Sequence, residues 1–219
     1  MIFRRGEVGP FELHLREAIA LNRERAPLYA RLSEGRSRAI SRSLILQERL
    51  LLPVARWFDG RAEPYHRAGV PLLGDAFVSM DRTPAFAAPG HPLPVPPRLR
   101  PNGRHLARAV RAALRGEGLP AAERIMRREI ETLSAEPAFH GMLRHMLEST
   151  LRIAVLAPHH ERMASDRGLP SPRPISLRIL RLHLRGFPAA VRLDRRAEPL
   201  QRRGIPIIVN DVPPIPYEI

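Results

Sequence analysis

Two stretches of the sequence carry histidine and glutamate at the same spacing. His14 and Glu17 form one His-x-x-Glu pair, and His145 and Glu148 form the other. Residues three apart lie on the same face of a helix, so each pair presents an imidazole and a carboxylate together. Both groups bind divalent metals and both serve as general acids and bases. These four residues are therefore candidate catalytic residues and candidate ligands of a divalent metal.

The second pair lies in a stretch, Met142 to Ala157, that is apolar almost all round and so predicts a central helix. Arg152 falls on the same stripe and is a candidate ligand-binding residue. A structural interpretation is also open, in which Glu148 pairs with Arg152 and His145 donates to a carbonyl. Di-iron proteins of the helical-bundle type carry the opposite order, Glu-x-x-His, so the spacing indicates metal chemistry only in general terms.

A second group of candidates comes from a segment that occurs twice. DGRAEPYHRAGVP begins at Asp59, and DRRAEPLQRRGIP begins at Asp194, 135 positions later. An aspartate and a glutamate stand four residues apart in each copy, Asp59 with Glu63 and Asp194 with Glu198. Both carboxylates share one face if the helix continues, which makes them candidate ligand-binding residues or an acid and base pair. The alternative is that they cap the helix that follows and pair with nearby arginines.

The similarity between the two copies extends beyond this segment. At the same offset, thirteen of the 38 residues from Arg38 to Asp75 recur, and the two His-x-x-Glu pairs match at an offset shorter by four. Two corresponding pairs differ in chemistry: Glu48 with His183, and His66 with Gln201. The pattern predicts an internally duplicated helical domain whose halves are related by a pseudo-two-fold axis. The polar His and carboxylate site is expected where the halves meet.

The elements that position these residues are predicted to be helices, so the fold class is mainly α. First helices are expected near 10–32 and 139–157, and second helices begin near Ser41 and Ser176, which are good N-cap residues. A proline in each second helix, Pro53 or Pro188, is expected to kink or break it.

The remaining elements follow from glycine and proline. Each copy of the repeated segment predicts a short helix that begins near Pro64 or Pro199 and stops at Gly69 or Gly204. The apolar runs after these glycines are compatible with two short β-strands. The expected organisation has four parts: 1–83 as the first half-repeat, 84–101 as a proline-rich connector, 102–138 as linking helices and 139–219 as the second half-repeat.

Composition narrows the function classes. The chain has 219 residues and a formal charge of +14, and all of its basic residues are arginine. It contains no cysteine, which excludes disulfides, zinc-thiolate sites and a cysteine nucleophile. No apolar run predicts a membrane span and no signal peptide is evident, so the cytoplasm is the default location. Phosphate-binding glycine loops and serine-hydrolase elbows are also missing from the sequence.

Two functions are compatible with these observations. The first is a helical ligand- or metal-binding protein, or an enzyme, with its site between the duplicated halves; its cofactor is unknown apart from the divalent metal that the His and Glu pairs suggest. The alternative is a non-catalytic arginine-rich module that binds an acidic protein partner or nucleic acid.

Overall fold

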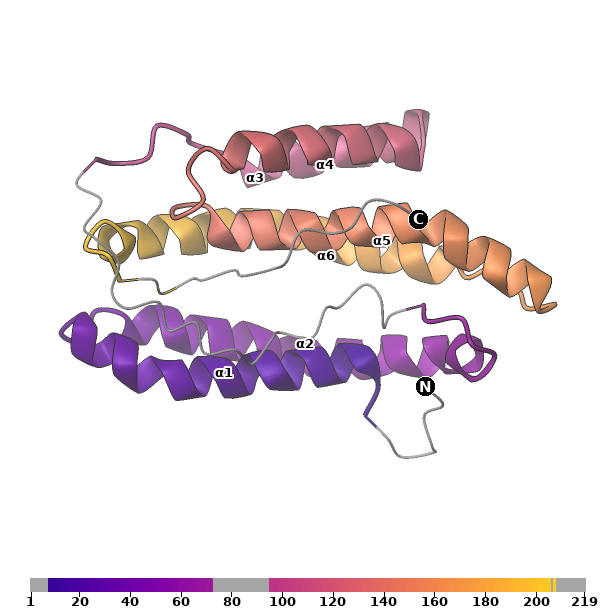
Figure 1. Cartoon of the computed structure of the whole chain (residues 1–219), viewed down its shortest axis with the longest axis horizontal. Coiled ribbons are helices and arrows are strands. Elements are labelled where there is room, and N and C mark those ends of the chain that lie inside the picture. The colour runs from indigo at the N-terminus through magenta and orange to yellow at the C-terminus, as the bar shows by residue number, and fades with distance from the viewer. Residues whose placement is uncertain (1–7, 73–94, 206, 208–219) are drawn as a thin grey trace. The chain divides into compact units, whose positions relative to one another are not determined.

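The structure of the chain is a computed structural model that describes residues 8–72, 95–205 and 207. The mainly α prediction is confirmed (Figure 1). The helices of the described residues are α1 (Pro10–Leu32), α2 (Arg38–Arg67), α3 (Gly103–Gly116), α4 (Leu119–Leu133), α5 (Gly141–Asp166) and α6 (Arg173–Gln201). Within the described residues, no helix combines the length and apolar character that crossing a bilayer requires.

The chain forms two compact units. Unit 1 comprises residues 1–83 and 156–179, and unit 2 comprises residues 84–155 and 180–219. Helices α1 and α2 therefore belong to unit 1 and helices α3 and α4 to unit 2, whereas the boundary between the units crosses α5 and α6.

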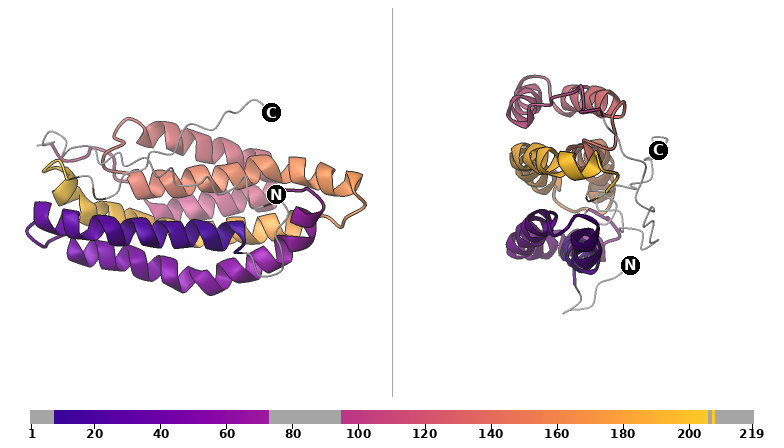
Figure 2. Two further views of the ribbon diagram at one scale, coloured as in Figure 1. Left: turned by 60° about the horizontal axis from the view of Figure 1, so that its bottom comes forward. Right: turned by 90° about the vertical axis from the view of Figure 1, so that its left-hand side faces the viewer.

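In unit 1, α1 and α2 lie side by side as a helical hairpin (Figure 2). The turn between them uses backbone conformations with positive φ at Glu34 and Gly35. The hydroxyl group of Ser33 donates to the carbonyl of Tyr29 at 2.6 Å and so satisfies the end of α1. Ala55 and Ala62 of α2 are completely buried. Side chains of this size leave room for close packing of neighbouring helices.

The prolines of the long helices do not end them. Helix α2 continues through Pro53 and Pro64, and α6 continues through Pro188 and Pro199. The predicted short helices at the Glu-Pro positions are therefore wrong, because each is the last part of one continuous helix. Three of these prolines are exposed and Pro188 is half-buried. Water can bond to a carbonyl that loses its helical partner at an exposed proline, which lowers the cost of the interruption.

The starts of the second helices are also corrected by the structure. Both begin three residues before the expected positions, so Ser41 and Ser176 lie inside α2 and α6 rather than at their N-caps. In the first turns, the N–H of Ser41 donates to the carbonyl of Ser37, and that of Ser176 donates to the carbonyl of Pro172. Both serines are buried, so they pack in the interior.

The two copies of the repeated segment end in the same way. Gly69 and Gly204 have φ values of 79° and 77°, a left-handed conformation that favours glycine. The N–H of Val70 bonds to the carbonyl of Tyr65, and the N–H of Ile205 bonds to the carbonyl of Leu200, which is the corresponding position. The predicted helix stops are thus in the right place.

The predicted short strands are not seen in the part of the chain that the structure describes. Residues 70–72, 205 and 207 are buried in part or in full and have no strand assignment. Residues 73, 206 and 208–209, which complete the two apolar runs, lie outside the described residues.

In unit 2, α3 and α4 form a second hairpin, with a left-handed Gly118 between them. Gly103 at the start of α3 lies so close to α6 that an added Cβ would stand 2.6 Å from the carbonyl oxygen of Phe187. Leu143, Leu147 and Leu151 of α5 are completely buried. They repeat every four residues and so form one buried face, whereas the sequence predicts a helix that is apolar almost all round.

Candidate functional site

The repeated aspartate of unit 1 caps a helix distant in sequence. The carboxylate of Asp59, on α2, accepts hydrogen bonds from the backbone N–H groups of Phe11 at 3.0 Å and Glu12 at 2.8 Å. These groups belong to the first turn of α1, whose own N-cap residue, Gly9, supplies no side-chain bond. A Cβ on Gly9 would stand 2.3 Å from the Asp59 carboxyl carbon, so glycine makes room for this cap.

The repeated aspartate of unit 2 does the same for α5. The carboxylate of Asp194, on α6, accepts hydrogen bonds from the backbone N–H groups of Met142 at 2.9 Å and Leu143 at 3.0 Å. Only 3% of Asp194 is exposed. Burial raises the pKa of the Asp194 carboxyl to about 7, although the two backbone hydrogen bonds lower it.

The capping role of the aspartates corrects one sequence-based interpretation. The alternative considered for Asp59 and Asp194 was that they cap the short helix that follows them. They instead cap the helix that precedes their own in the chain, across the hairpin. Burial also raises the pKa of Asp59, but this residue is half-buried rather than fully enclosed.

The repeated glutamates form ion pairs. Glu63 pairs with Arg67 one turn later on α2, as one alternative expected. Glu198 pairs with Arg100, which lies in the segment before α3, at 2.8 Å. Both arginines are more than half exposed, so each pair contributes little stability on its own.

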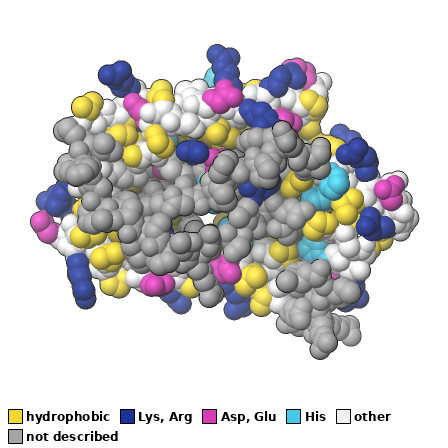
Figure 3. Space-filling model, in the orientation of Figure 1, with side chains coloured by type: hydrophobic (Ala, Val, Ile, Leu, Met, Phe, Trp, Pro, Cys, Tyr) yellow, Lys and Arg dark blue, Asp and Glu magenta, His cyan; other side chains and the backbone are white. Residues whose placement is uncertain are grey.

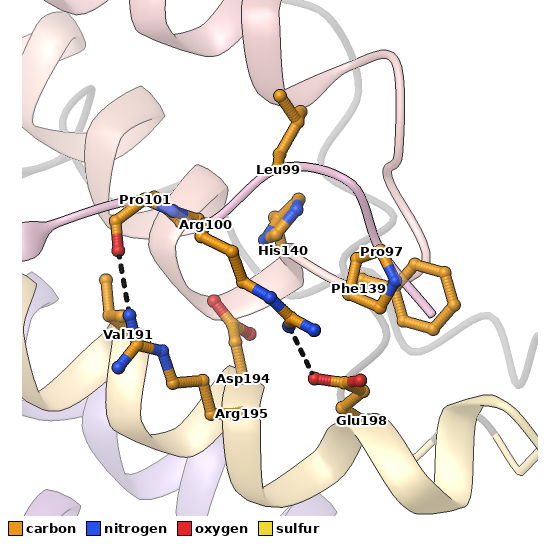
Figure 4. Close-up of a pocket in the computed structure, with 10 residues that line it drawn as sticks. All are labelled: Pro97, Leu99, Arg100, Pro101, Phe139, His140, Val191, Asp194, Arg195 and Glu198. Atoms are coloured by element: carbon orange, nitrogen blue, oxygen red, sulfur yellow. Dashed lines mark hydrogen bonds and ion pairs between the residues drawn. The ribbon is translucent and has the colours of Figure 1, made fainter. Parts of the chain in front are cut away.

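A small pocket of unit 2 surrounds Asp194 and Glu198 (Figure 4). Its volume is about 10 Å³, which is enough for one water molecule. The residues that line it are Pro97, Leu99, Arg100, Pro101, Phe139, His140, Val191, Asp194, Arg195 and Glu198. Figure 4 shows the side chains of Arg100 and Glu198 directed toward each other, and the side chain of Asp194 projecting from α6 toward the segment before α3. The pocket is too small for a substrate.

His140 is the residue of this pocket that sequence reasoning missed. Its imidazole is 4% exposed and its Nε2 lies 3.4 Å from a carboxylate oxygen of Glu136. Burial lowers the pKa of His140 despite the opposing effect of Glu136. Glu136 also accepts bonds from the backbone N–H groups of Arg98 and Leu99. These contacts fasten the described end of the proline-rich connector to unit 2, and no local sequence pattern indicates them.

The His-x-x-Glu pairs lie in different units. His14 and Glu17 are on α1, which belongs to unit 1. His145, Glu148 and Arg152 are on the first part of α5, which belongs to unit 2. Glu148 pairs with Arg144 at 2.8 Å, one turn before it. No group of three or more His, Asp or Glu side chains among the described residues is arranged to hold a metal ion. Joint metal binding by these four residues stays a prediction.

One of the positions where the two copies differ holds a polar pair in the interior. The amide of Asn22 on α1 donates to a carboxylate oxygen of Glu48 on α2 at 2.9 Å. Burial raises the pKa of Glu48 to about 7. In the second copy, Nδ1 of His183 lies 3.4 Å from the hydroxyl oxygen of Thr150.

Unit 1 carries a larger concave surface, which we call the α1–α2 groove. Its volume is about 520 Å³ and it is open to solvent. Its apolar part is formed by Ala26, Pro27, Ala30 and Ile45, and its polar part by Arg23, Arg31 and Arg38. The three arginines are exposed, and within the described residues none of them has an ion-pair partner. The groove therefore combines an apolar floor with uncompensated positive charge.

Comparison with known proteins gives no match, since neither a family model nor a curated protein nor a solved structure resembles the chain significantly.

Proposed function

We propose that this protein is a non-catalytic binding module whose α1–α2 groove binds an acidic segment of a partner protein. The observation that carries the proposal is the grouping of Arg23, Arg31 and Arg38 around an apolar floor. Uncompensated arginines on a concave surface attract carboxylates and align them through paired N–H donors. The apolar floor adds a contact that aliphatic side chains of a polypeptide can fill.

The roles of the acidic residues support a binding function over an enzymatic one. Asp59 and Asp194 use their carboxylates to cap helices. Glu63 and Glu198 pair with arginines. A carboxylate that caps a helix or pairs with an arginine has its oxygens engaged by the fold, so it is less available as an acid or base toward a substrate. The arginines of the groove carry no such structural duty.

The charge distribution agrees with a local rather than a general attraction. Among the described residues visible in Figure 3, arginine side chains are interspersed with carboxylates. The 22 acidic residues offset 22 of the 36 arginines, which leaves the net charge of +14. A partner is expected to favour places where arginines form no ion pair within the described residues, and the groove is such a place.

We also propose that two pairs of helices consecutive in the chain, α1 with α2 and α5 with α6, descend from one duplicated unit. The cap bonds support this history, because Phe11 and Glu12 correspond to Met142 and Leu143 at the offset of the His-x-x-Glu pairs. A duplicated scaffold explains why the motif retains its aspartate in both copies, since each copy needs its cap.

The test is a binding titration with a labelled peptide rich in Asp and Glu, using the full chain. Replacing Arg23, Arg31 and Arg38 together by Gln is expected to weaken binding about tenfold or more at moderate salt. The control replaces Arg104, Arg108 and Arg115 of α3, which are exposed and likewise have no ion-pair partner. Both variants lose three charges, but only the first changes the groove.

Two results would contradict the proposal. Equal weakening by both triple variants would mean that only net charge matters. The second is that a single-stranded oligonucleotide binds more tightly than the acidic peptide and that the groove variant loses affinity for it. That result would assign the groove to nucleic acid.

A further inference from the structure

An apolar stripe runs along the solvent-facing side of α2. It consists of Leu46, Leu50, Pro53 and Trp57, which follow one another at intervals of four, three and four residues and so share one face. Leu46 is 57% exposed, Leu50 is 67% exposed and Trp57 is 40% exposed. Exposed apolar residues on consecutive turns of one helix mark an interaction surface more often than scattered ones do.

The second half of the chain indicates that folding does not require this stripe. At the offset of 135 residues, Leu46, Leu50 and Trp57 correspond to Arg181, Arg185 and Arg192 of α6. All three arginines are exposed. The same scaffold position thus accepts charged side chains in one copy, and the leucines in α2 need a reason other than core packing.

Arginines accompany the stripe on the side that faces the groove. With 3.6 residues per turn, Arg42 and Arg49 fall between the stripe and Ile45, which lines the groove. Both are exposed, and among the described residues neither has an ion-pair partner. The surface of α2 therefore continues from the groove through a row of unpaired arginines to the apolar stripe.

We infer that the partner segment is an acidic amphipathic α-helix that lays its apolar face on the stripe and its carboxylates on Arg42, Arg49 and the groove. This inference rests on the proposed function and specifies the partner. The stripe spans eleven residue steps from Leu46 to Trp57, or about 16 Å, which a partner helix covers in about three turns. Opposite charge along one edge fixes how the helix is oriented.

Other occupants fit the surface less well. A second copy of the chain would bring its own Arg42 and Arg49 against these arginines. Nucleic acid offers no aliphatic face for Leu46 and Leu50, which are the most exposed members of the stripe. The guanidinium groups of Arg61 and Arg178 lie 5.2 Å and 4.6 Å from the Trp57 ring centroid, a cation–π arrangement.

The experiment compares two synthetic peptides of identical composition against the full chain. One places leucine on one helical face with glutamate on both flanks. The other scrambles the same residues so that the leucines do not share a face. The stripe predicts that the amphipathic peptide binds about tenfold more tightly than the scrambled one. The double variant Leu46→Ser with Leu50→Ser should remove this difference and leave binding of the scrambled peptide unchanged.

The matched control is Leu13→Ser with Leu28→Ser. These α1 leucines are 45% and 37% exposed and do not line the groove, so the control variant should retain the preference. Circular dichroism checks that each variant keeps its helices.

The outcomes separate the two proposals. If both peptides bind equally to the unaltered chain and both depend on Arg23, Arg31 and Arg38, the groove proposal holds and the helix inference fails. The mass of the free protein is also measured by sedimentation. If the stripe variant sediments with a smaller mass than the unaltered chain, the stripe binds a second copy and the inference is overturned. Absence of binding by either peptide would contradict both.

Discussion

Replacing Asp194 by Ala is the sharpest test of how the repeated motif holds the protein together. The change removes the acceptor of two backbone N–H groups at the start of α5, those of Met142 and Leu143. A buried N–H without a partner costs roughly 1–3 kcal/mol, and water that enters the vacated space recovers part of this. We therefore expect unit 2 to lose roughly 2–4 kcal/mol of unfolding free energy.

Asp194→Asn separates the hydrogen bonds from the charge. The amide oxygen accepts one of the two N–H bonds and the NH₂ group accepts none, so the expected loss is about 1–2 kcal/mol. The variant also cannot titrate. Because the folded pKa of Asp194, about 7, exceeds the unfolded value of 3.8, this residue stabilises the folded state fully below about pH 4. That contribution, no more than about 4 kcal/mol, is lost as the pH rises to about 7.

The assay is urea unfolding followed by far-ultraviolet circular dichroism at about pH 5 and about pH 8. The unaltered chain should be less stable at the higher pH, and Asp194→Asn should reduce this difference. The corresponding change in unit 1, Asp59→Ala, should cost only about 1 kcal/mol because Asp59 is half-buried. Equal and small losses for Asp194→Ala and Asp59→Ala, below about 0.5 kcal/mol, would refute the assignment of a buried cap.

Three other changes test separate parts of the structure. Gly103→Ala should destabilise unit 2 by about 1–3 kcal/mol, because the new Cβ would stand 2.6 Å from the backbone carbonyl oxygen of Phe187. Gly116→Ala on the same helix is the control, since a Cβ there has open space and the change should be neutral or stabilising. Thermal unfolding of the two variants measures the difference. Glu48→Gln should flatten the loss of stability between about pH 4.5 and about pH 7, since burial raises the Glu48 pKa above its unfolded value and favours the protonated folded state. If the predicted metal site exists, elemental analysis of the purified chain will show a divalent metal that His145→Ala removes; a metal-free unaltered chain contradicts it.

The positions of the helices follow largely from local sequence. The range expected for the first helix, 10–32, agrees with α1, and the expected stops at Gly69 and Gly204 agree with the left-handed glycines. These features are local because a glycine without a Cβ adopts positive φ wherever a helix must end. The breaks expected at the prolines did not occur: α2 and α6 continue through them, and three of the four prolines are exposed, where water can bond to the freed carbonyl.

The roles of the repeated acids could not be derived from local sequence. Spacing placed Asp59 and Asp194 correctly in two equivalent segments, but their hydrogen-bond partners lie about fifty residues away in the chain. Which backbone groups a carboxylate reaches depends on how two helices pair, and local residue preferences carry little information about that pairing. The burial of His140 beside Asp194 and Glu198 also depends on this pairing, so local sequence does not predict it.

The sequence alone determined the helical class, the repeated motif, the helix stops and the arginine-based charge, because each depends on residue type or on neighbours within a few positions. Only the tertiary structure decided that the repeated aspartates cap opposite helices, that Asp194 is buried enough to shift its pKa, and that Arg23, Arg31 and Arg38 gather around one groove. Burial and long-range pairing arise when the chain folds back on itself, and desolvation then sets the chemistry of each carboxylate.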